Sequence, residues 1–358
     1  MSGTVRVPMV DLAARHRRLA GPTEAAVLEV LRSGRWVGGP RLAEAEARLA
    51  ALFGRAHGVG VNSGTDALSL ALQALGVGPG HEVLVPALSF FATAGAVARI
   101  GARPVVVDVL PDLPLMCPEA ARAALTARTR AAVPVHLFGM TCPDPGLPVP
   151  LVEDSAQAVG QAPPARLGVL TAASFYPTKT LGAAGDAGLV ATDDPALAAA
   201  VRRLGGHGAV AGEAHLHALV AGQVGGNSRL DPLQAAILLA QLDDLPRRVA
   251  RRRAIAARYD AALPAGFAAP TRAAADPVHH YLLRGAGRDA LARWLAARGV
   301  ESAIYYPRPL SAQPALQPQA PCPVAEAWSR TCLSLPCHEE LTAAQVALVV
   351  ASLEEFAP

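Results

Sequence analysis

The first 240 residues of the chain alternate short, continuous apolar runs with segments whose apolar residues recur at helical spacing. Apolar runs of this kind occupy 82–86, 103–109 and 188–194, and helical spacing is clear over 65–76. Strands that are apolar along their whole length are buried on both faces, which is typical of a mostly parallel sheet sandwiched between helices. The sequence therefore predicts an α/β fold for this part of the chain.

One connection within this pattern is unusually short. Further strands are expected at 58–64, 130–139, 149–154 and 172–177, and further helices at 43–54 and 91–101. Only the proline-rich segment "MTCPDPGLPV" joins the strands at 130–139 and 149–154. A parallel crossover normally needs a dozen or more residues and usually contains a helix. We therefore expect the crossover helix to be missing or vestigial here.

The pattern changes near residue 240. A long helix is expected over about 233–262, followed by the segments "VHHYLLRG", "RDALARWLAARGV" and "SAIYYP" and a C-terminal helix. This mixture predicts a smaller α+β domain. We place the large domain at 1–240, with its N-terminal segment, and the small domain at 241–358.

Composition excludes several classes of protein. The net charge of +3 is too small to indicate nucleic-acid binding, and the arginine-rich segment 246–260 is interpreted as one solvated helix face. The longest uncharged apolar stretch, 83–98, contains Pro86 and Gly95 and is too short to span a membrane. No signal peptide is visible, and the five cysteines form no CxxC pair, so we expect a cytoplasmic protein.

Lys179 is the only lysine in the chain, whereas the other 31 of the 32 basic residues are arginine. Arginine does not readily lose its proton, so it cannot serve as a nucleophilic amine. A desolvated lysine can lose its proton and condense with an aldehyde to form a Schiff base. Lys179 is therefore a candidate catalytic amine, although chance survival in an arginine-rich sequence would also explain it.

The residues around this lysine match the needs of pyridoxal phosphate, an aldehyde cofactor with a phosphate and a pyridine ring. Gly64 and Thr65 stand at a strand-to-helix turn, where backbone N–H groups favour a phosphate, and the hydroxyl of Ser174 suits the same group. Asp154 ends a strand and could pair with the pyridinium nitrogen. Parallel strands bring their carboxyl ends to one edge, where ligands bind.

Two side chains complete this set, and each feature also has a structural explanation. Gln157 follows Asp154 by three residues, and Phe90 follows a strand and could cover the face of the ring. A Ser-Gly-Thr turn is also a common N-cap, an aspartate after a strand is often structural, and Phe90 could belong to the core. Their order along the chain, closed by the only lysine, favours the cofactor site.

A dinucleotide-binding fold is the rival interpretation of the glycine-rich turn. Gly58, Gly60 and Gly64 come close to the G-x-G-x-x-G fingerprint, but Ser63 stands where the third glycine belongs. The acidic residue expected at the end of the second strand is also missing, because Glu82 precedes that strand. The fingerprint lacks its context, so we set this alternative aside.

Several longer blocks occur in the order found in one known family. They include "SGRWVGGP", "NSGTDALSLALQALGVGPGHEVLVP", "EDSAQAVG", "SFYPTKTLGAAGDAG" and "GGNSRLDPLQAAILLAQL". Over nearly its whole length the chain resembles the DegT-type sugar aminotransferases, a branch of the fold-type I pyridoxal phosphate enzymes. The resemblance implies that an amino acid, usually L-glutamate, loads the cofactor as pyridoxamine phosphate. The amino group then passes to a keto group of a nucleotide-linked sugar.

The resemblance also implies a role for each matching residue. Lys179 would form the Schiff base and shuttle a proton, and Asp154 would pair with the pyridinium nitrogen. The remaining cofactor contacts would be Gln157 near the ring hydroxyl, Phe90 on the ring face, and Gly64, Thr65 and Ser174 on the phosphate. Asn227 would reach the phosphate in the other subunit, which implies a homodimer with shared active sites. Some relatives carry histidine in place of the lysine and are sugar dehydratases, and Lys179 argues against that activity.

The substrate contacts are open at this stage. The chain has Tyr305-Tyr306-Pro307 where the family commonly has His-Tyr-Pro, and Thr180 where it commonly has asparagine. Candidate substrate residues are Arg229, Tyr306, Arg308 and His207, with a structural role equally open for Arg229. The keto group could lie at C3 or C4, the base could be uracil or thymine, and the sugar could carry a carboxylate. A C3 keto group is preferred because relatives with a similar histidine-rich loop aminate 3-keto sugars.

Two further alternatives concern metal binding and regulation. His215 and His217 form a His-x-His pair near His207, but no carboxylate or cysteine completes a ligand set, so no metal is expected. A catalytically silent, pyridoxal-phosphate-binding regulatory protein on the same fold is the second class of function. The filled cofactor positions argue against it.

Overall fold

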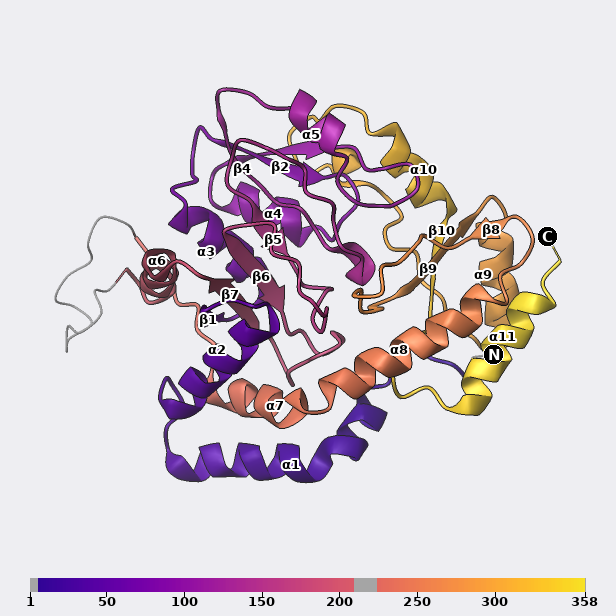
Figure 1. Cartoon of the computed structure of the whole chain (residues 1–358), viewed down its shortest axis with the longest axis horizontal. Helices are drawn as coiled ribbons and strands as arrows, with labels where there is room; N and C mark the ends of the chain where they lie inside the picture. Colours follow the sequence, from indigo (N-terminus) through magenta and orange to yellow (C-terminus); the bar gives the residue numbers. More distant parts are fainter. Residues whose placement is uncertain (1–5, 209–223, 358) are drawn as a thin grey trace.

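The computed structural model describes residues 6–208 and 224–357. Within them, a seven-stranded sheet has the order β3–β2–β4–β5–β6–β7–β1 (Figure 1). Its strands are β1 (His57–Val61), β2 (Glu82–Pro86), β3 (Arg103–Val107), β4 (Thr129–Ala132), β5 (Val152–Asp154), β6 (Leu170–Ser174) and β7 (Gly188–Thr192). Strand β7 alone runs opposite to the other six strands, so the predicted mostly parallel sheet is confirmed.

The two halves of this sheet meet between β4 and β5. Two isolated parallel bridges, Ala132–Leu151 and Val135–Asp154, join them. The connection between these strands contains one short 3₁₀ turn, Leu137–Gly139, and no α-helix in any of its residues, all of which the structure describes. The expected loss of the crossover helix is thus confirmed.

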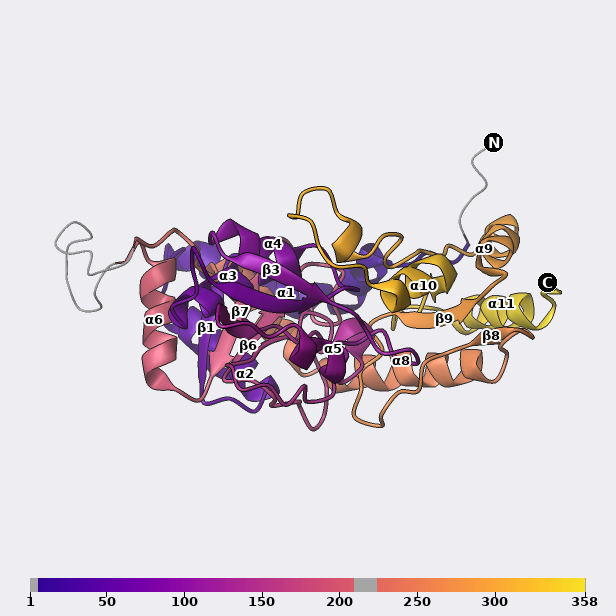
Figure 2. The ribbon, with the colours of Figure 1, turned by 90° about the horizontal axis from the view of Figure 1, so that it is seen from above.

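Six helices accompany these strands in the described part of the chain. They are α1 (Leu12–Ser33), α2 (Pro40–Leu52), α3 (Gly64–Ala74), α4 (Ala92–Arg99), α5 (Pro118–Ala123) and α6 (Pro195–Gly205). Of these, α2, α3, α4 and α6 pack against the sheet through their apolar sides. Helix α3 contacts α4 and β6, and α6 contacts β1 at one end of the sheet, as Figure 2 shows. Helices α1 and α7 (Pro232–Leu242) lie side by side (Figure 1).

The single helix expected over 233–262 is wrong: two helices occupy this segment. Helix α7 ends at Leu242, and α8 runs over Leu245–Asp260. Pro246 lies in the first turn of α8, where backbone N–H groups have no partner within the helix, so its lack of an N–H costs no hydrogen bond. Its ring would clash with the carbonyl of residue 242 in a continuous helix, which explains the break.

The interpretation of 246–260 as one solvated face is also wrong for two of its arginines. Arg248 and Arg252 are 0% and 2% exposed. Their guanidinium groups pair with Asp244 and Glu339, and this pairing makes their burial possible. The outer face of α8 carries Arg247, which is exposed as expected.

The C-terminal part has its own sheet and its own core. Its elements are β8 (Phe267–Ala268), β9 (Tyr281–Gly285), α9 (Arg288–Ala297), α10 (Pro323–Thr331), β10 (Cys332–Leu335) and α11 (Ala343–Glu354). The strands form an antiparallel sheet, β10–β9–β8, and α11 packs against α8 and α9. Tyr281, Leu291 and Val346 lie in one buried apolar cluster. The smaller α+β unit is confirmed, whereas a boundary at residue 240 stays a prediction.

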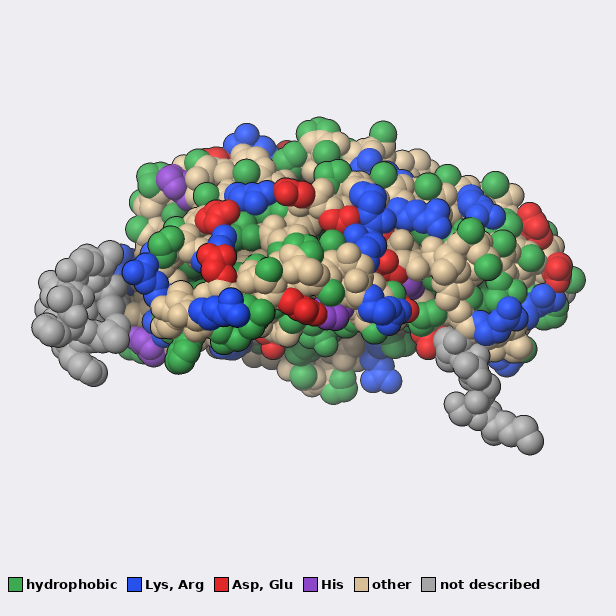
Figure 3. All heavy atoms as spheres, turned by 90° about the horizontal axis from the view of Figure 1, so that it is seen from below, with side chains coloured by type: hydrophobic (Ala, Val, Ile, Leu, Met, Phe, Trp, Pro, Cys, Tyr) green, Lys and Arg blue, Asp and Glu red, His purple; other side chains and the backbone are tan. Residues whose placement is uncertain are grey.

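The surface over α1, α7 and α8 mixes charges of both signs. Figure 3 shows this face, on which basic and acidic side chains are interspersed. Among the described residues, no helix is both long enough and apolar enough to cross a membrane.

Candidate active site

A cavity of about 650 Å³ opens at the carboxyl ends of β5 and β6 and at the start of α3. Asp154 is the last residue of β5, and Ser174 is the last residue of β6. The C-terminal part closes the cavity with His279, His280 and the segment 304–307. The site therefore lies at the sheet edge that parallel strands make available for ligands, and it is shared between the two parts of the chain.

Lys179 lines this cavity on a turn that follows β6. The turn is closed by a hydrogen bond of 2.8 Å from the Lys179 N–H to the carbonyl oxygen of Tyr176. Burial lowers the pKa of the Lys179 amine to about 8, against the opposing effect of the Asp154 carboxylate. The amine therefore loses its proton far more readily than an exposed lysine does.

Asp154 is buried on the wall of the same cavity, and two donors hold its carboxylate. The hydroxyl of Thr93 donates to Oδ2 at 2.9 Å, and the Ala156 N–H donates to Oδ1 at 3.2 Å. Burial raises the pKa of Asp154, while these donors and Lys179 act in the opposite direction. A cation placed in the cavity beside Asp154 would relieve this cost of burial.

The start of α3 forms the floor of the cavity, together with Ser174. Ser63 caps this helix by accepting a hydrogen bond from the Asp66 N–H, and Gly64 and Thr65 line the cavity in the first turn. A Cβ atom on Gly64 would lie 2.6 Å from the Cβ of Ser174, so glycine is required for this close approach. Backbone N–H groups at a helix start, beside a serine hydroxyl, make an anion site.

Gln157 and Phe90 lie on the wall and at the mouth of the cavity. The Gln157 amide donates to the Tyr306 hydroxyl at 3.3 Å and accepts from the Phe138 N–H at 2.6 Å. Phe90 is 60% exposed, and its ring centroid lies 6.3 Å from that of Tyr306. Phe90 does not belong to the core, which removes the structural explanation considered for it.

Sequence reasoning missed a pair of histidines, His279 and His280, that also lines the cavity. His280 stacks on Tyr305 with ring centroids 4.6 Å apart, and the Nδ1 atom of the buried His279 has no hydrogen-bond partner. Burial, with Lys179 and Arg252 nearby, lowers the pKa of His280 to about 3, so its ring is neutral. Two adjacent histidines at the start of an apolar strand were the available signal.

Four sequence candidates lie outside the cavity of their own chain: Asn227, Arg229, Arg308 and His207. All four are exposed. Asn62 holds the first two by their backbones, donating to the Asn227 carbonyl at 3.0 Å and accepting from the Arg229 N–H at 3.3 Å. Asn62 therefore holds the backbone of this segment beside the start of α3.

The structure describes only part of the histidine-rich segment. His215 and His217 lie outside the described residues. Over 6–208 and 224–357, no group of three His, Cys, Asp or Glu side chains is arranged to hold a metal ion. The five cysteines are free.

These residues fit pyridoxal phosphate. One cavity brings together an amine with a lowered pKa, a buried carboxylate and an anion cradle that a Cβ atom would fill. This donor set suits an aldehyde, a pyridinium nitrogen and a phosphate, respectively.

Residues 19–354 match the profile of the DegT/DnrJ/EryC1/StrS aminotransferase family. The chain belongs to this family. It is 41% identical to a dTDP-3-amino-3,4,6-trideoxy-alpha-D-glucose transaminase of Streptomyces venezuelae, over 99% of this chain and 97% of that protein. It is 36% identical to a UDP-2-acetamido-2-deoxy-3-oxo-D-glucuronate aminotransferase of Pseudomonas aeruginosa, over 97% of this chain and 99% of that one.

The fold of the aminotransferase also matches solved structures of related enzymes. The structure of S. venezuelae DesV in complex with a ketimine intermediate superimposes with a TM-score of 0.91 at 40% identity, covering 98% of each chain. Other solved structures of this fold hold the cofactor in its pyridoxal or pyridoxamine form. The protein is therefore a pyridoxal-phosphate-dependent nucleotide-sugar aminotransferase.

Proposed function

We propose that the enzyme transfers the amino group of L-glutamate to a C3 keto group of a nucleotide-linked sugar, with Lys179 as its catalytic base. The observation that carries the catalytic assignment is the cavity in which Lys179 and Asp154 face the anion cradle of α3. The names of two relatives support C3, because one describes a 3-amino sugar and the other a 3-oxo sugar.

Lys179 is the residue that moves the proton. Pyridoxal phosphate supplies an aldehyde that condenses with amines and a pyridinium ring that withdraws electrons. With its pKa lowered to about 8, the Nζ atom of Lys179 is in part unprotonated near neutral pH and can accept a proton from the substrate carbon. Burial keeps competing water away from the amine.

Asp154 and the start of α3 would hold the ring nitrogen and the phosphate of the cofactor, respectively. Asp154, fixed by Thr93, would hold the pyridinium proton, and the ion pair would stabilise the otherwise costly buried carboxylate. The N–H groups of Gly64 and Thr65, with the Ser174 hydroxyl, would hold the phosphate. Gln157 would bind near the ring hydroxyl, and Phe90 would cover the ring face.

We propose that the active unit is a homodimer. Asn227 and Arg229 are exposed and do not line their own chain's cavity, and Asn62 holds their backbones beside the start of α3. This placement suits Asn227 for the phosphate bound by the partner and Arg229 for the partner's substrate. Tyr306 is the candidate substrate contact within the chain, because it lines the cavity. Arg308, which follows the cavity-lining Pro307, and His207 are exposed and stand as further candidates.

The expected compartment of this homodimer is the cytoplasm. All five cysteines are free, which suits a reducing environment.

Half-reaction spectroscopy tests the proposal. The holoenzyme is treated with L-glutamate until the yellow pyridoxal form is converted, and a panel of 3-keto and 4-keto nucleotide sugars is then added. Return of the visible absorption with 3-keto sugars is the expected result. Return with 4-keto sugars alone would make the C3 assignment wrong, and no conversion by any amino acid would favour the silent regulatory alternative.

A second comparison tests whether the sugar carries a carboxylate. Arginine binds a carboxylate in a bidentate manner, so Arg229→Ala and Arg308→Ala should raise KM for an acidic sugar far more than for a neutral analogue. Equal effects on both sugars would assign these arginines to the diphosphate or to a structural role.

A further inference from the structure

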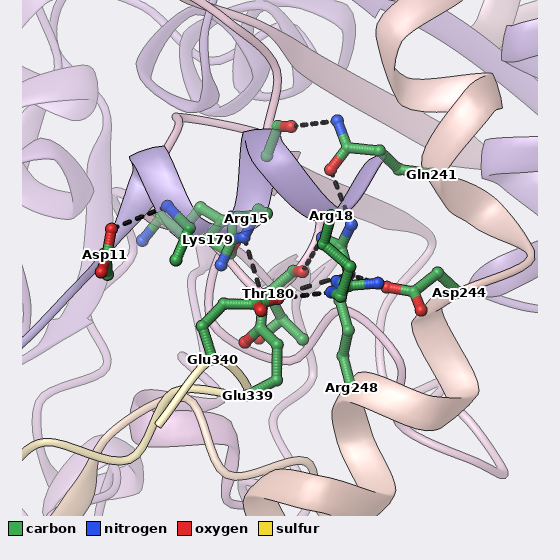
Figure 4. A network of polar contacts seen from close by, with 12 residues as sticks. Asp11, Arg15, Arg18, Lys179, Thr180, Gln241, Asp244, Arg248, Glu339 and Glu340 are labelled. Atoms are coloured by element: carbon green, nitrogen blue, oxygen red, sulfur yellow. Dashed lines mark hydrogen bonds and ion pairs between the residues drawn. The ribbon is translucent and has the colours of Figure 1, made fainter. Parts of the chain in front are cut away.

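The turn that carries Lys179 is held by an arginine that is far from it in sequence. Arg15 of α1 donates from one nitrogen, Nη1, to the carbonyl oxygens of Pro177 at 2.9 Å and Lys179 at 3.0 Å. Figure 4 shows Arg15 next to Lys179. Arg15 is 7% exposed. Its guanidinium group therefore fixes the backbone on both sides of residue 178.

The next carbonyls of the same turn are also held by side chains. Arg248 of α8 donates to the Thr180 carbonyl at 2.9 Å, and Gln241 of α7 donates to the Gly182 carbonyl at 2.9 Å. Arg248 also donates to the Gln241 amide oxygen at 2.8 Å (Figure 4). Three helices thus position one turn through its carbonyl oxygens.

One buried carboxylate orients Arg15. Glu339, whose side chain is 0% exposed, accepts from Arg15 Nε at 2.9 Å through Oε1 and from Arg252 Nε at 2.9 Å through Oε2. Arg252 in turn donates to the Val278 and His279 carbonyls at 3.3 and 2.9 Å. Glu339 therefore connects the lysine turn, through Arg15 and Arg252, to the backbone of His279, which also lines the cavity.

Through these contacts Arg15 holds the backbone of the residue that carries the proposed catalytic amine. We propose that Arg15, oriented by Glu339, is a positioning residue that keeps the Lys179 amine held in the cavity and away from bulk water. This inference rests on the proposed role of Lys179. Without Arg15, the turn loses two carbonyl contacts beside the lysine and the amine gains water.

The only lysine of the chain makes a direct test practical. The apoenzyme is treated with trinitrobenzenesulfonate over a range of pH, and modification of Lys179 is followed by peptide mass spectrometry. The midpoint of rate against pH reports the pKa of this one amine without any cofactor. Arg15→Met is compared with Arg288→Met, a matched control that loses a buried arginine.

Arg288 resembles Arg15 in its burial, in its two carbonyl contacts and in having a carboxylate partner, although that partner, Asp289, is exposed. It is 8% exposed, donates from Nη1 to the Ser329 and Cys332 carbonyls at 3.3 and 2.9 Å, and pairs with Asp289. It does not line the cavity. Arg288→Met therefore reports the general effect of losing a buried arginine on this protein.

Arg15→Met should move the midpoint for Lys179 upward, and Arg288→Met should leave it at the wild-type value. A rise of one unit from about 8 would reduce the modification rate at pH 8 roughly fivefold, because fewer amines are unprotonated. Equal midpoints in the two variants would overturn the inference.

The double variant Arg15→Met/Glu339→Gln separates position from charge. It removes one positive and one negative charge, so the net charge beside the lysine turn is unchanged. Because Arg252 loses its Glu339 partner, circular dichroism first establishes that the variant is folded. Its midpoint should also rise; a return to the wild-type midpoint would mean that Arg15 acts by charge alone and would overturn the inference. If wild-type Lys179 formed no borohydride-stable adduct with pyridoxal phosphate, the proposed function would fail instead, whatever the titrations show.

Discussion

Thr93 donates a hydrogen bond of 2.9 Å from its hydroxyl to the buried carboxylate of Asp154. The Thr93 oxygen lies 2.7 Å from the Ser89 hydroxyl, so a short chain of hydroxyl groups supports the carboxylate from α4. The contact orients the group that we expect to face the pyridinium ring. It also links helix α4 to the end of strand β5.

Thr93→Val should weaken retention of the cofactor while leaving the fold intact. Valine matches the shape of threonine but cannot donate, so Asp154 loses one donor at a cost of roughly 1–3 kcal/mol. Dialysis of the holoenzyme, followed by absorbance, measures the loss. Ser69→Ala is the control, since its buried hydroxyl donates to the Ala96 carbonyl and does not reach Asp154. Equal retention in both variants would contradict the prediction.

Asp154→Asn should lower the pKa of Lys179 in the apoenzyme below its wild-type value of about 8. The Asp154 carboxylate is the charge that opposes the effect of burial, so its removal leaves desolvation unopposed. The pH dependence of trinitrobenzenesulfonate modification at Lys179 reads this shift. An unchanged midpoint would indicate that Asp154 is uncharged where Lys179 titrates.

The stability of the enzyme should fall in acid in part through Glu339. Despite burial, which acts in the opposite direction, Arg252 and Arg15 lower the pKa of Glu339 to about 2, from 4.5 for an ordinary glutamate. A carboxylate with a lowered folded-state pKa stabilises the protein above pH 4.5 and loses that contribution as the pH falls toward 2.

Glu339→Gln should therefore flatten the acid limb of the stability curve. Between pH 6 and pH 3 the wild type should lose about 2 kcal/mol of unfolding free energy through this group, and the variant should not. Urea titrations at the two pH values measure the difference. Parallel losses in both proteins would show that other carboxylates dominate acid unfolding.

A mixed dimer should reveal the shared active sites. Lys179→Ala and Asn227→Ala chains, each inactive or weak as homodimers, are coexpressed with different tags and purified as a heterodimer. If Asn227 serves the partner's cofactor, one site of the heterodimer has both residues intact and should retain cofactor and activity. A heterodimer no more active than the two homodimers would place Asn227 in its own chain's site.

The sequence predicted that Asp154, Ser174, Lys179 and Gly64 meet, because each ends or follows a strand at one edge of the sheet. Asp154 and Ser174 end neighbouring parallel strands, and Lys179 and Gly64 follow strand ends at the same edge. A local pattern of strands and helices is therefore enough to bring these residues together.

The buried arginines, Glu339 and the histidines of the cavity could not be predicted, because their positions depend on contacts between distant parts of the sequence. Arg252 was expected on a solvated face, yet its carboxylate partner lies 87 residues further along. Arg15 and Glu339 are 324 residues apart. His279 reaches the cavity from the C-terminal part, so its role depends on how the two parts of the chain pack, which periodicity does not report.

The carboxylate of Glu339 has a consequence for the design of chimeric enzymes. Exchanging C-terminal segments between relatives is an obvious route to new sugar specificity, and such an exchange would replace residue 339 while keeping Arg15 and Arg252. A donor segment without a carboxylate there would leave two guanidinium groups buried with no counter-charge. The residues at positions 15, 252 and 339 of a chimera should therefore all come from the same parent enzyme.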